Sequence, residues 1–180
     1  MRLAVLLLVG IGLSGCAGGS VISHSYYTSA YSPDHVQLAA ASGTAIATIR
    51  NNPFPQDSGN AGVLAAMQGR NVGPRIYFSQ APRPDDRYGY RVILDFGRPG
   101  PAAGYQCQGE STSPASAPPS GPIDVTATFC VGDRLLTDAS GTVGGATGPG
   151  DPRFRALIGD IMVALTPPYD PSRGGNDWSD

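Results

Sequence analysis

The stretch Tyr90-Arg91-Val92-Ile93-Leu94-Asp95-Phe96 is the clearest secondary-structure signal in the chain, and it decides the fold class. Alternate positions in it are apolar and fall on one face of an extended strand: Tyr90, Val92, Leu94 and Phe96. Arg91 and Asp95 fall on the other face. The alternation predicts a strand with one buried face and one face toward water, which is typical of antiparallel sheets.

Further strands are predicted on both sides of this segment. Residues 123–131 alternate in the same way, and a turn at Gly132-Asp133 leads to a partner strand around residues 134–139. Upstream, residues 35–41 and 44–50 bracket Ser42-Gly43, which predicts a hairpin. Residues 75–80 predict a short strand between the hairpin and the 90–96 strand.

Two amphipathic helices complete the pattern. Asp151 followed by Pro152 is a strong helix start, and the residues after it form a continuous apolar stripe: Phe154, Leu157, Ile158, Ile161 and Leu165. Residues 58–70 predict a weaker helix, since three glycines interrupt it. We therefore predict an α+β domain with a mostly antiparallel sheet and two amphipathic helices packed on one face.

Cys107 and Cys130 predict one disulfide, because a pair of cysteines in an exported chain is oxidised. Cys130 faces away from Phe129 in its strand, so the bond is expected across the outer face or edge of the sheet, outside the main core. The alternative is a redox or metal-binding pair, for which the usual CxxC spacing is missing.

The N-terminus combines Arg2, an apolar run over residues 3–13, and the closing sequence Leu13-Ser14-Gly15-Cys16. The run is too short to span a bilayer, which needs about 20 apolar residues, and its layout is that of a signal peptide. The closing sequence resembles the lipobox of bacterial lipoproteins. That resemblance implies cleavage before Cys16 and a diacylglycerol on its thiol; the alternative is an ordinary signal peptide with a chance cysteine.

The lipoprotein resemblance implies a location and a domain layout. A lipid on Cys16 attaches the chain to a membrane, and Ala17 in the next position favours the outer membrane facing the periplasm, as in enteric bacteria. We expect a signal peptide over residues 1–15, a lipidated tether over 16–34, one domain over 35–169 and a disordered tail over 170–180. Tyrosines in the tether, or Trp178 in the tail, are alternatively expected to dock on the domain or a partner.

Several stretches of the exported part are similar to those of proteobacterial lipoproteins with no known activity: Asn52-Pro53-Phe54, residues 66–71, residues 129–134 and residues 166–169. The order of elements is also similar, at the level of fold only, to the lipopolysaccharide-assembly lipoprotein and to auxiliary lipoproteins of lipid transporters. Fold alone does not imply function.

Composition excludes several classes of chemistry. The 12 basic residues are all arginines, and the formal net charge of −2 does not suggest a nucleic-acid partner. With no lysine, the chain has no phosphate-loop lysine and no Schiff-base lysine. No later segment approaches the length of a membrane span.

The sequence predicts no catalytic, cofactor or metal site. His24 and His35 are the only histidines, and no Cys/His cluster or G-x-S-x-G motif occurs. Asp34-His35 is interpreted as a turn pair, and Asp85-Asp86 as a solvated loop cluster. The remaining acids are assigned to turns, caps, helix surfaces and a Ser/Pro-rich loop: Asp133, Asp138, Asp151, Asp160 and Glu110.

We therefore expect a non-enzymatic cell-envelope lipoprotein that binds or scaffolds an envelope protein, a glycolipid or peptidoglycan. The alternative is a periplasmic enzyme whose site is assembled from scattered Asp, Ser, Tyr and Arg residues. A third hypothesis, an anchored domain with a mainly structural role, is not separable from the first by sequence.

Overall fold

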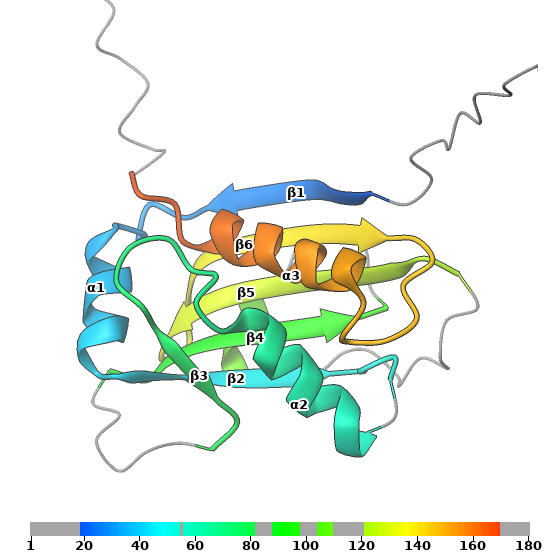
Figure 1. Cartoon of the computed structure of the whole chain (residues 1–180). Helices are drawn as coiled ribbons and strands as arrows, with labels where there is room; N and C mark the ends of the chain where they lie inside the picture. The colour runs from blue at the N-terminus through cyan, green and yellow to red at the C-terminus, as the bar shows by residue number, and fades with distance from the viewer. Residues whose placement is uncertain (1–18, 55, 82–87, 98–103, 110–120, 170–180) are drawn as a thin grey trace, which may run out of the picture.

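The computed structural model describes residues 19–54, 56–81, 88–97, 104–109 and 121–169. The signal peptide, Cys16, Asp85-Asp86, Glu110 and the tail with Trp178 lie outside these ranges, so their predictions stay predictions. The described chain forms an open six-stranded sheet in the order β1-β6-β5-β4-β2-β3 (Figure 1).

The strands are β1 (Ser20–Tyr27), β2 (Thr44–Arg50), β3 (Tyr77–Ser79), β4 (Tyr90–Phe96), β5 (Ile123–Val131) and β6 (Arg134–Val143). The helices are α1 (Asp34–Ala41), α2 (Gln56–Met67) and α3 (Pro152–Leu165), with a 3-10 turn, η1, over Gly104–Gln108. The pairs β1–β6, β6–β5 and β5–β4 are antiparallel, whereas β2 pairs in parallel with β4 and β3. The predicted α+β class is confirmed.

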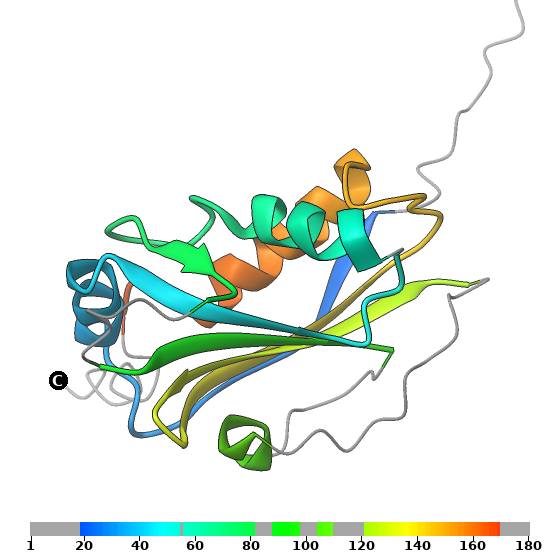
Figure 2. The same cartoon turned by 90° about the horizontal axis from the view of Figure 1, so that it is seen from below.

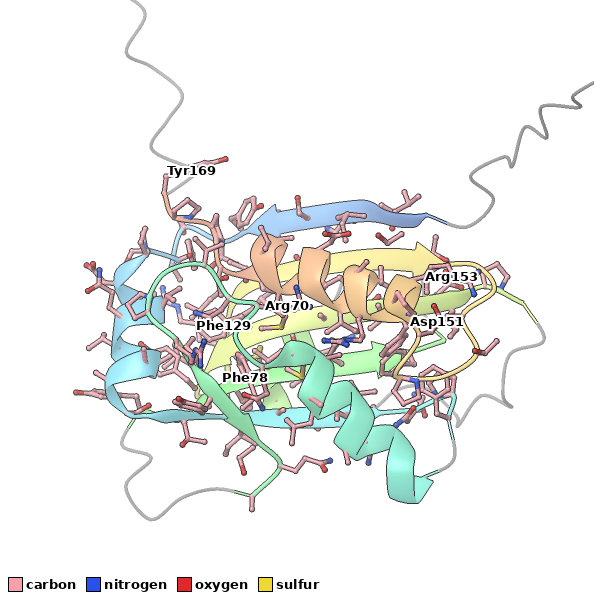
Figure 3. All side chains as sticks on the ribbon, viewed as in Figure 1. Arg70, Phe78, Phe129, Asp151, Arg153 and Tyr169 are labelled. Atoms are coloured by element: carbon pink, nitrogen blue, oxygen red, sulfur yellow. A yellow bond between two sulfur atoms is a disulfide. The ribbon has the colours of Figure 1, made fainter. Side chains whose placement is uncertain are left out.

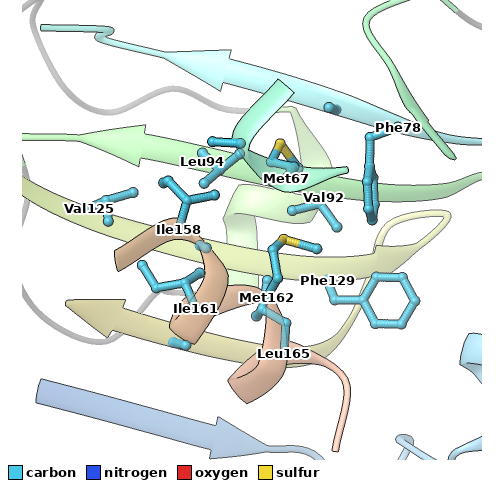
Figure 4. Close-up of a cluster of buried hydrophobic side chains, with 14 of the residues drawn as sticks. Met67, Phe78, Val92, Leu94, Val125, Phe129, Ile158, Ile161, Met162 and Leu165 are labelled. Carbon is cyan, nitrogen blue, oxygen red and sulfur yellow. The ribbon is translucent and has the colours of Figure 1, made fainter. Parts of the chain in front are cut away.

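Helices α2 and α3 cover one face of the sheet, and η1 lies on the other (Figure 2). Under the helices lies the main core, where the whole predicted stripe of α3 is buried against the strands. Figure 4 shows this cluster, in which Ile158, Ile161 and Leu165 of α3 gather with Val92, Val125 and Phe129 of the strands. Helix α3 begins as predicted, because the Asp151 carboxylate accepts the backbone N–H of Arg153 at 2.9 Å.

The second face of β4 differs from the prediction, because it is buried and does not face water. Ile93 and Asp95 are 1% and 2% exposed. Ile93 packs with Cys107 and Cys130 in a small cluster separate from the main core. The predicted Cys107–Cys130 disulfide is present there and attaches η1 to the outer face of β5, as expected.

The prediction of a strand over residues 35–41 is wrong, because these residues belong to α1. Val36 and Ala39 are buried one helical turn apart, a spacing that suits a helix. Gly43, expected in a hairpin, instead ends the helix: its φ is +76°, and its N–H donates to the Ala40 carbonyl at 2.9 Å.

Part of the predicted tether also belongs to the domain. Residues 20–27 form β1, an edge strand paired with β6 from Ser20↔Val143 to Tyr27↔Thr137. The tyrosine alternative is correct for Tyr31, which is 2% exposed and donates its hydroxyl to the Pro167 carbonyl at 2.6 Å. Three residues, 17–19, therefore separate Cys16 from the first strand.

Candidate functional site

The candidate site is a hollow of about 280 Å³ on the helix side of the domain. Its walls come from the end of α2, the connection to β3, the start of β3 and the first half of α3. The lining residues are Ala65, Gln68, Gly69, Arg70, Arg75, Tyr77 and Arg155. We call Arg70, Arg75 and Arg155 the arginine cluster; Figure 3 shows Arg70 between α3 and the end of α2.

Side-chain amides fix the shape of the connection that carries two of these arginines. Gln68 donates to the Phe78 carbonyl at 2.8 Å and accepts the Phe78 N–H at 3.2 Å, which ties the end of α2 to β3. Asn71 donates to the Pro74 carbonyl at 2.7 Å and accepts the Ile76 N–H at 3.2 Å. These hydrogen bonds therefore fix the α2–β3 connection, which forms one wall of the hollow.

Two glycines lie against the arginine side chains. Gly69 has a φ of +66° just after α2, and a Cβ built on it would lie 3.7 Å from an Arg75 guanidinium nitrogen. Gly159 lies within α3, and a Cβ there would lie 3.6 Å from Cδ of Arg70. The Arg70 side chain thus crosses α3 at the position where the helix has no side chain of its own.

The arginine cluster has no internal charge compensation. Within the described ranges, none of the three side chains has a hydrogen-bond or ion-pair partner, whereas Arg91 pairs with Asp133 at 3.0 Å and Arg153 with Asp151 at 2.9 Å. The lining contains no carboxylate, serine or histidine. A guanidinium presents a rigid fork of donors that matches carboxylate and phosphate groups, so this arrangement suits an anion.

The hollow continues along the seam between α2 and α3. Two neighbouring hollows of about 270 and 280 Å³ are lined from α2, α3 and the β6–α3 connection, and each shares Arg155 with the first. Tyr77, 56% exposed, lies at the end of this series of hollows that is farthest from the β6–α3 connection. The seam therefore offers room for an extended ligand that carries its negative charge near the arginine cluster.

The histidines considered from sequence lie elsewhere. His35 does not pair with Asp34: its Nδ1 lies 2.9 Å from the Tyr90 hydroxyl and its Nε2 lies 3.0 Å from the Ala30 carbonyl. Because a carbonyl only accepts, Nε2 carries the proton and Nδ1 accepts from Tyr90. Burial raises the pKa of the Tyr90 hydroxyl, and the nearby Tyr88 makes a smaller contribution in the same direction. His35 thus holds α1 against the sheet.

Of the acids assigned from sequence that the structure describes, three lie as predicted and Asp138 does not. Asp133 lies in the β5–β6 turn, Asp151 caps α3, and Asp160 is exposed on α3, where it accepts the Ser20 hydroxyl at 2.8 Å. Asp138 was grouped with the turn, cap and helix-surface acids, but it is 1% exposed in the middle of β6. Its carboxylate lies 3.7 Å from Nε2 of His24 on β1, a pair created by the β1–β6 register.

The described residues contain neither a metal-binding cluster nor a membrane-spanning helix. No group of three or more His, Cys, Asp or Glu residues in the described ranges could hold a metal ion. Of the helices in these same ranges, none is long and apolar enough to cross a membrane.

The arginine cluster was missed from sequence, because its members are separated by up to 85 positions and belong to no motif. The available signal was compositional: Arg70 and Arg75 lie in a stretch, residues 58–81, whose described residues contain no acid. Sequence did not place Arg155 beside them, since that proximity depends on how α3 packs against α2.

Comparison with known proteins assigns no family. No family model matches the chain, and no curated protein matches it. Among solved structures, a PelC variant dodecamer from Paraburkholderia phytofirmans is similar with a TM-score of 0.44 and 11% identity, covering 83% of this chain and 97% of that one. A second PelC dodecamer crystal form from the same organism gives a TM-score of 0.40 and 11% identity, covering 83% and 98%. These similarities do not place the chain in the family of PelC.

Proposed function

We propose that this chain is a non-enzymatic lipoprotein of the cell envelope that binds an anionic envelope glycan or glycolipid at the arginine cluster. A lipid on Cys16 attaches it to a membrane, which we take to be the outer membrane facing the periplasm. The observation that carries the proposal is the convergence on one hollow of three arginines with no partner among the described residues, in a chain whose net charge is negative.

Charge explains why the cluster suits a ligand better than a purely structural role. Like charges that converge without a counter-charge repel one another, and the nearby described acids are already engaged: Asp151 with Arg153, and Asp160 with Ser20. An anion in the hollow removes this repulsion and gains charge-assisted hydrogen bonds, each worth about 1.5–3 kcal/mol. The free protein thus keeps a site whose best complement is an external negative group.

The size and lining favour a glycan over a cofactor. Pockets that enclose small molecules usually measure about 300–1,000 Å³, and the arginine-lined hollow is slightly smaller. It accommodates one acidic group and its neighbouring ring, while the adjoining hollows continue along the helix seam. Tyr77 at the rim offers an aromatic face together with a hydroxyl for polar contacts.

The proposal is tested by binding to matched polymers. We expect the protein to bind polygalacturonate, which carries a carboxylate on every sugar, and to ignore neutral dextran of similar length in titration calorimetry. Replacing Arg70 by Gln removes the guanidinium charge but keeps a polar side chain, and should weaken binding about tenfold or more.

Arg134→Gln is the matched control, because Arg134 is exposed at the start of β6 and lies outside the hollow. We expect the control variant to bind like the unaltered protein. If a variant with Arg70, Arg75 and Arg155 all replaced by Gln binds polygalacturonate as tightly as the unaltered protein, the assignment of the site is wrong. Binding of dextran as strong as that of polygalacturonate would overturn the anionic specificity.

A further inference from the structure

The start of the first strand lies close to the proposed lipid, and this places one end of the domain against the membrane. Ser20 begins β1, and four peptide steps from Cys16 span at most about 14 Å. Strand β6 has 10 residues, so the sheet is about 33 Å long at roughly 3.3 Å per residue. The link is therefore much shorter than the domain that it holds.

The topology defines which parts of the chain share this end. Ser20 pairs with Val143, which pairs with Ile123, so the start of β1, the end of β6 and the start of β5 lie together. The ends of β4 and β2 follow in register, and α3 begins at the same end (Figure 1). We call the described connections here, residues 51–54, 121–122 and 144–151, the anchor end.

The anchor end carries almost no net charge. Asp151 is its single charged residue within the described ranges, and that carboxylate is paired with Arg153 at 2.9 Å. Most of the rest is glycine, proline, alanine, threonine and asparagine. Val21, in the second position of β1, is 56% exposed beside it. Such a surface can approach lipid headgroups without removing unpaired charges from water.

The opposite end of the sheet is different. Asp34, Asp133 and Arg134 are exposed there, and Tyr169, the last described residue, lies at that end (Figure 3). The helix side carries the unpaired arginine cluster. Of these surfaces, the anchor end is the one that combines nearness to Cys16 with a lack of unpaired charge.

We propose that the anchor end is a membrane-contacting surface, so that the domain stands on the bilayer with its strands pointing away from it. This inference rests on the lipid anchor of the proposed function, but not on the ligand of the arginine cluster. In this orientation the seam between α2 and α3 runs from the bilayer toward the aqueous side. Gly150 lines the end of the seam at the anchor end, and Tyr77 lines the end farther from the bilayer.

Depth-dependent fluorescence quenching tests the orientation. The lipidated protein is purified from membranes, its lipid is verified by intact mass, and it is reconstituted into phosphatidylcholine vesicles containing a headgroup-nitroxide lipid. Single cysteines for an environment-sensitive label replace Gly148 at the anchor end, Arg134 at the far end and Ala65 on the helix side. A Cβ at Gly148 would meet no atom within 4 Å, so that variant should fold normally.

We expect the label at Gly148→Cys to be quenched several-fold more than the labels at Arg134→Cys and Ala65→Cys. Equal quenching at all three positions would overturn the orientation. Strongest quenching at Ala65→Cys would overturn it too, and would mean that the arginine cluster lies on the lipid. Absence of a lipid mass would overturn both the anchor and this inference, whereas failure of polygalacturonate binding would leave the orientation result unaffected.

The short link has its own control. Insertion of a flexible eight-residue Gly/Ser segment between Gly18 and Gly19 should reduce the difference in quenching between the Gly148→Cys and Arg134→Cys labels, because the domain is then free to rotate above the bilayer. An unchanged difference would overturn the role of the link.

Discussion

At the scale of single residues, Gly141 shows how tightly the helix layer is packed on the sheet. A Cβ built on it would lie 2.8 Å from Cδ1 of Leu157 on α3 and 2.9 Å from the Val21 carbonyl oxygen on β1. Both distances are shorter than real Cβ contacts, and a backbone oxygen cannot turn aside. The absence of a side chain at this position lets β1, β6 and α3 meet.

Gly141→Ala is therefore expected to destabilise the domain, by about 1–3 kcal/mol, the usual cost of overpacking a core. Urea denaturation followed by circular dichroism measures the change. Gly144→Ala, three residues further on, is the control, because a Cβ there meets nothing within 4 Å. If the two variants unfold at the same urea concentration, the close approach at Gly141 does not exclude a side chain there, and the prediction is wrong.

The ionisation of Asp151 makes the stability of the domain depend on pH. Hydrogen bonds from the Arg153 side chain and then its backbone hold the pKa of the Asp151 carboxyl well below its ordinary value of 3.8. A pKa that is lower in the folded state means that folding favours the carboxylate. The stabilisation is complete above the unfolded pKa and is lost as the pH falls below it toward the folded value.

Asp151→Asn retains a helix-capping side chain but lacks the charge. We expect its melting temperature to be lower than that of the unaltered protein at pH 7, and the gap to shrink as the pH falls from about 5 to about 2. Thermal melts at several pH values measure it, with Asp160→Asn as the control on the exposed side of α3. A gap that stays constant with pH would exclude the ionised cap as its cause.

At the scale of elements, the segments that follow one simple period were predicted and those that depend on packing were not. Helix α3 and strands β4 and β5 show clear periodicity and were predicted within a residue or two. Residues 20–27 belong to a stretch rich in Gly, Ser and Tyr that predicted a tether, and they form β1 because they pair with the distant β6. In α2, Gly62 lowers helix propensity, yet a Cβ there would lie 2.5 Å from the Pro149 ring.

The disulfide acts between two elements, because it attaches η1 to β5 on the face away from the helices. Replacing Cys107 and Cys130 by Ser should lower the free energy of unfolding by about 2–4 kcal/mol, since the loop they close spans 23 positions. Chemical denaturation with and without reductant measures this. The reduced unaltered protein should approach the double variant, and equal stability of all forms would contradict the prediction.

At the scale of the whole molecule, the fold class could be predicted, whereas the candidate site could not. Arg70, Arg75 and Arg155 come together only after α2 and α3 settle side by side on the sheet and Gln68 and Asn71 shape the connection between α2 and β3. Periodicity reports which face of each element is buried, but not which exposed side chains meet across elements. The pair between the half-buried His24 and the buried Asp138 was missed for the same reason.

The β1–β6 pairing also determines when the first strand can join the sheet. Residues 20–27 find their partner more than 100 positions later, so in the exported precursor proposed above β1 emerges long before β6. During that interval the residues around Cys16 are held by no sheet, and a membrane enzyme has free access to the bond before it. Once β6 arrives, β1 is fixed within four positions of that cysteine. Under the proposed lipidation of Cys16, maturation of the anchor thus belongs to the unfolded chain, and closure of the sheet ends the time available for it.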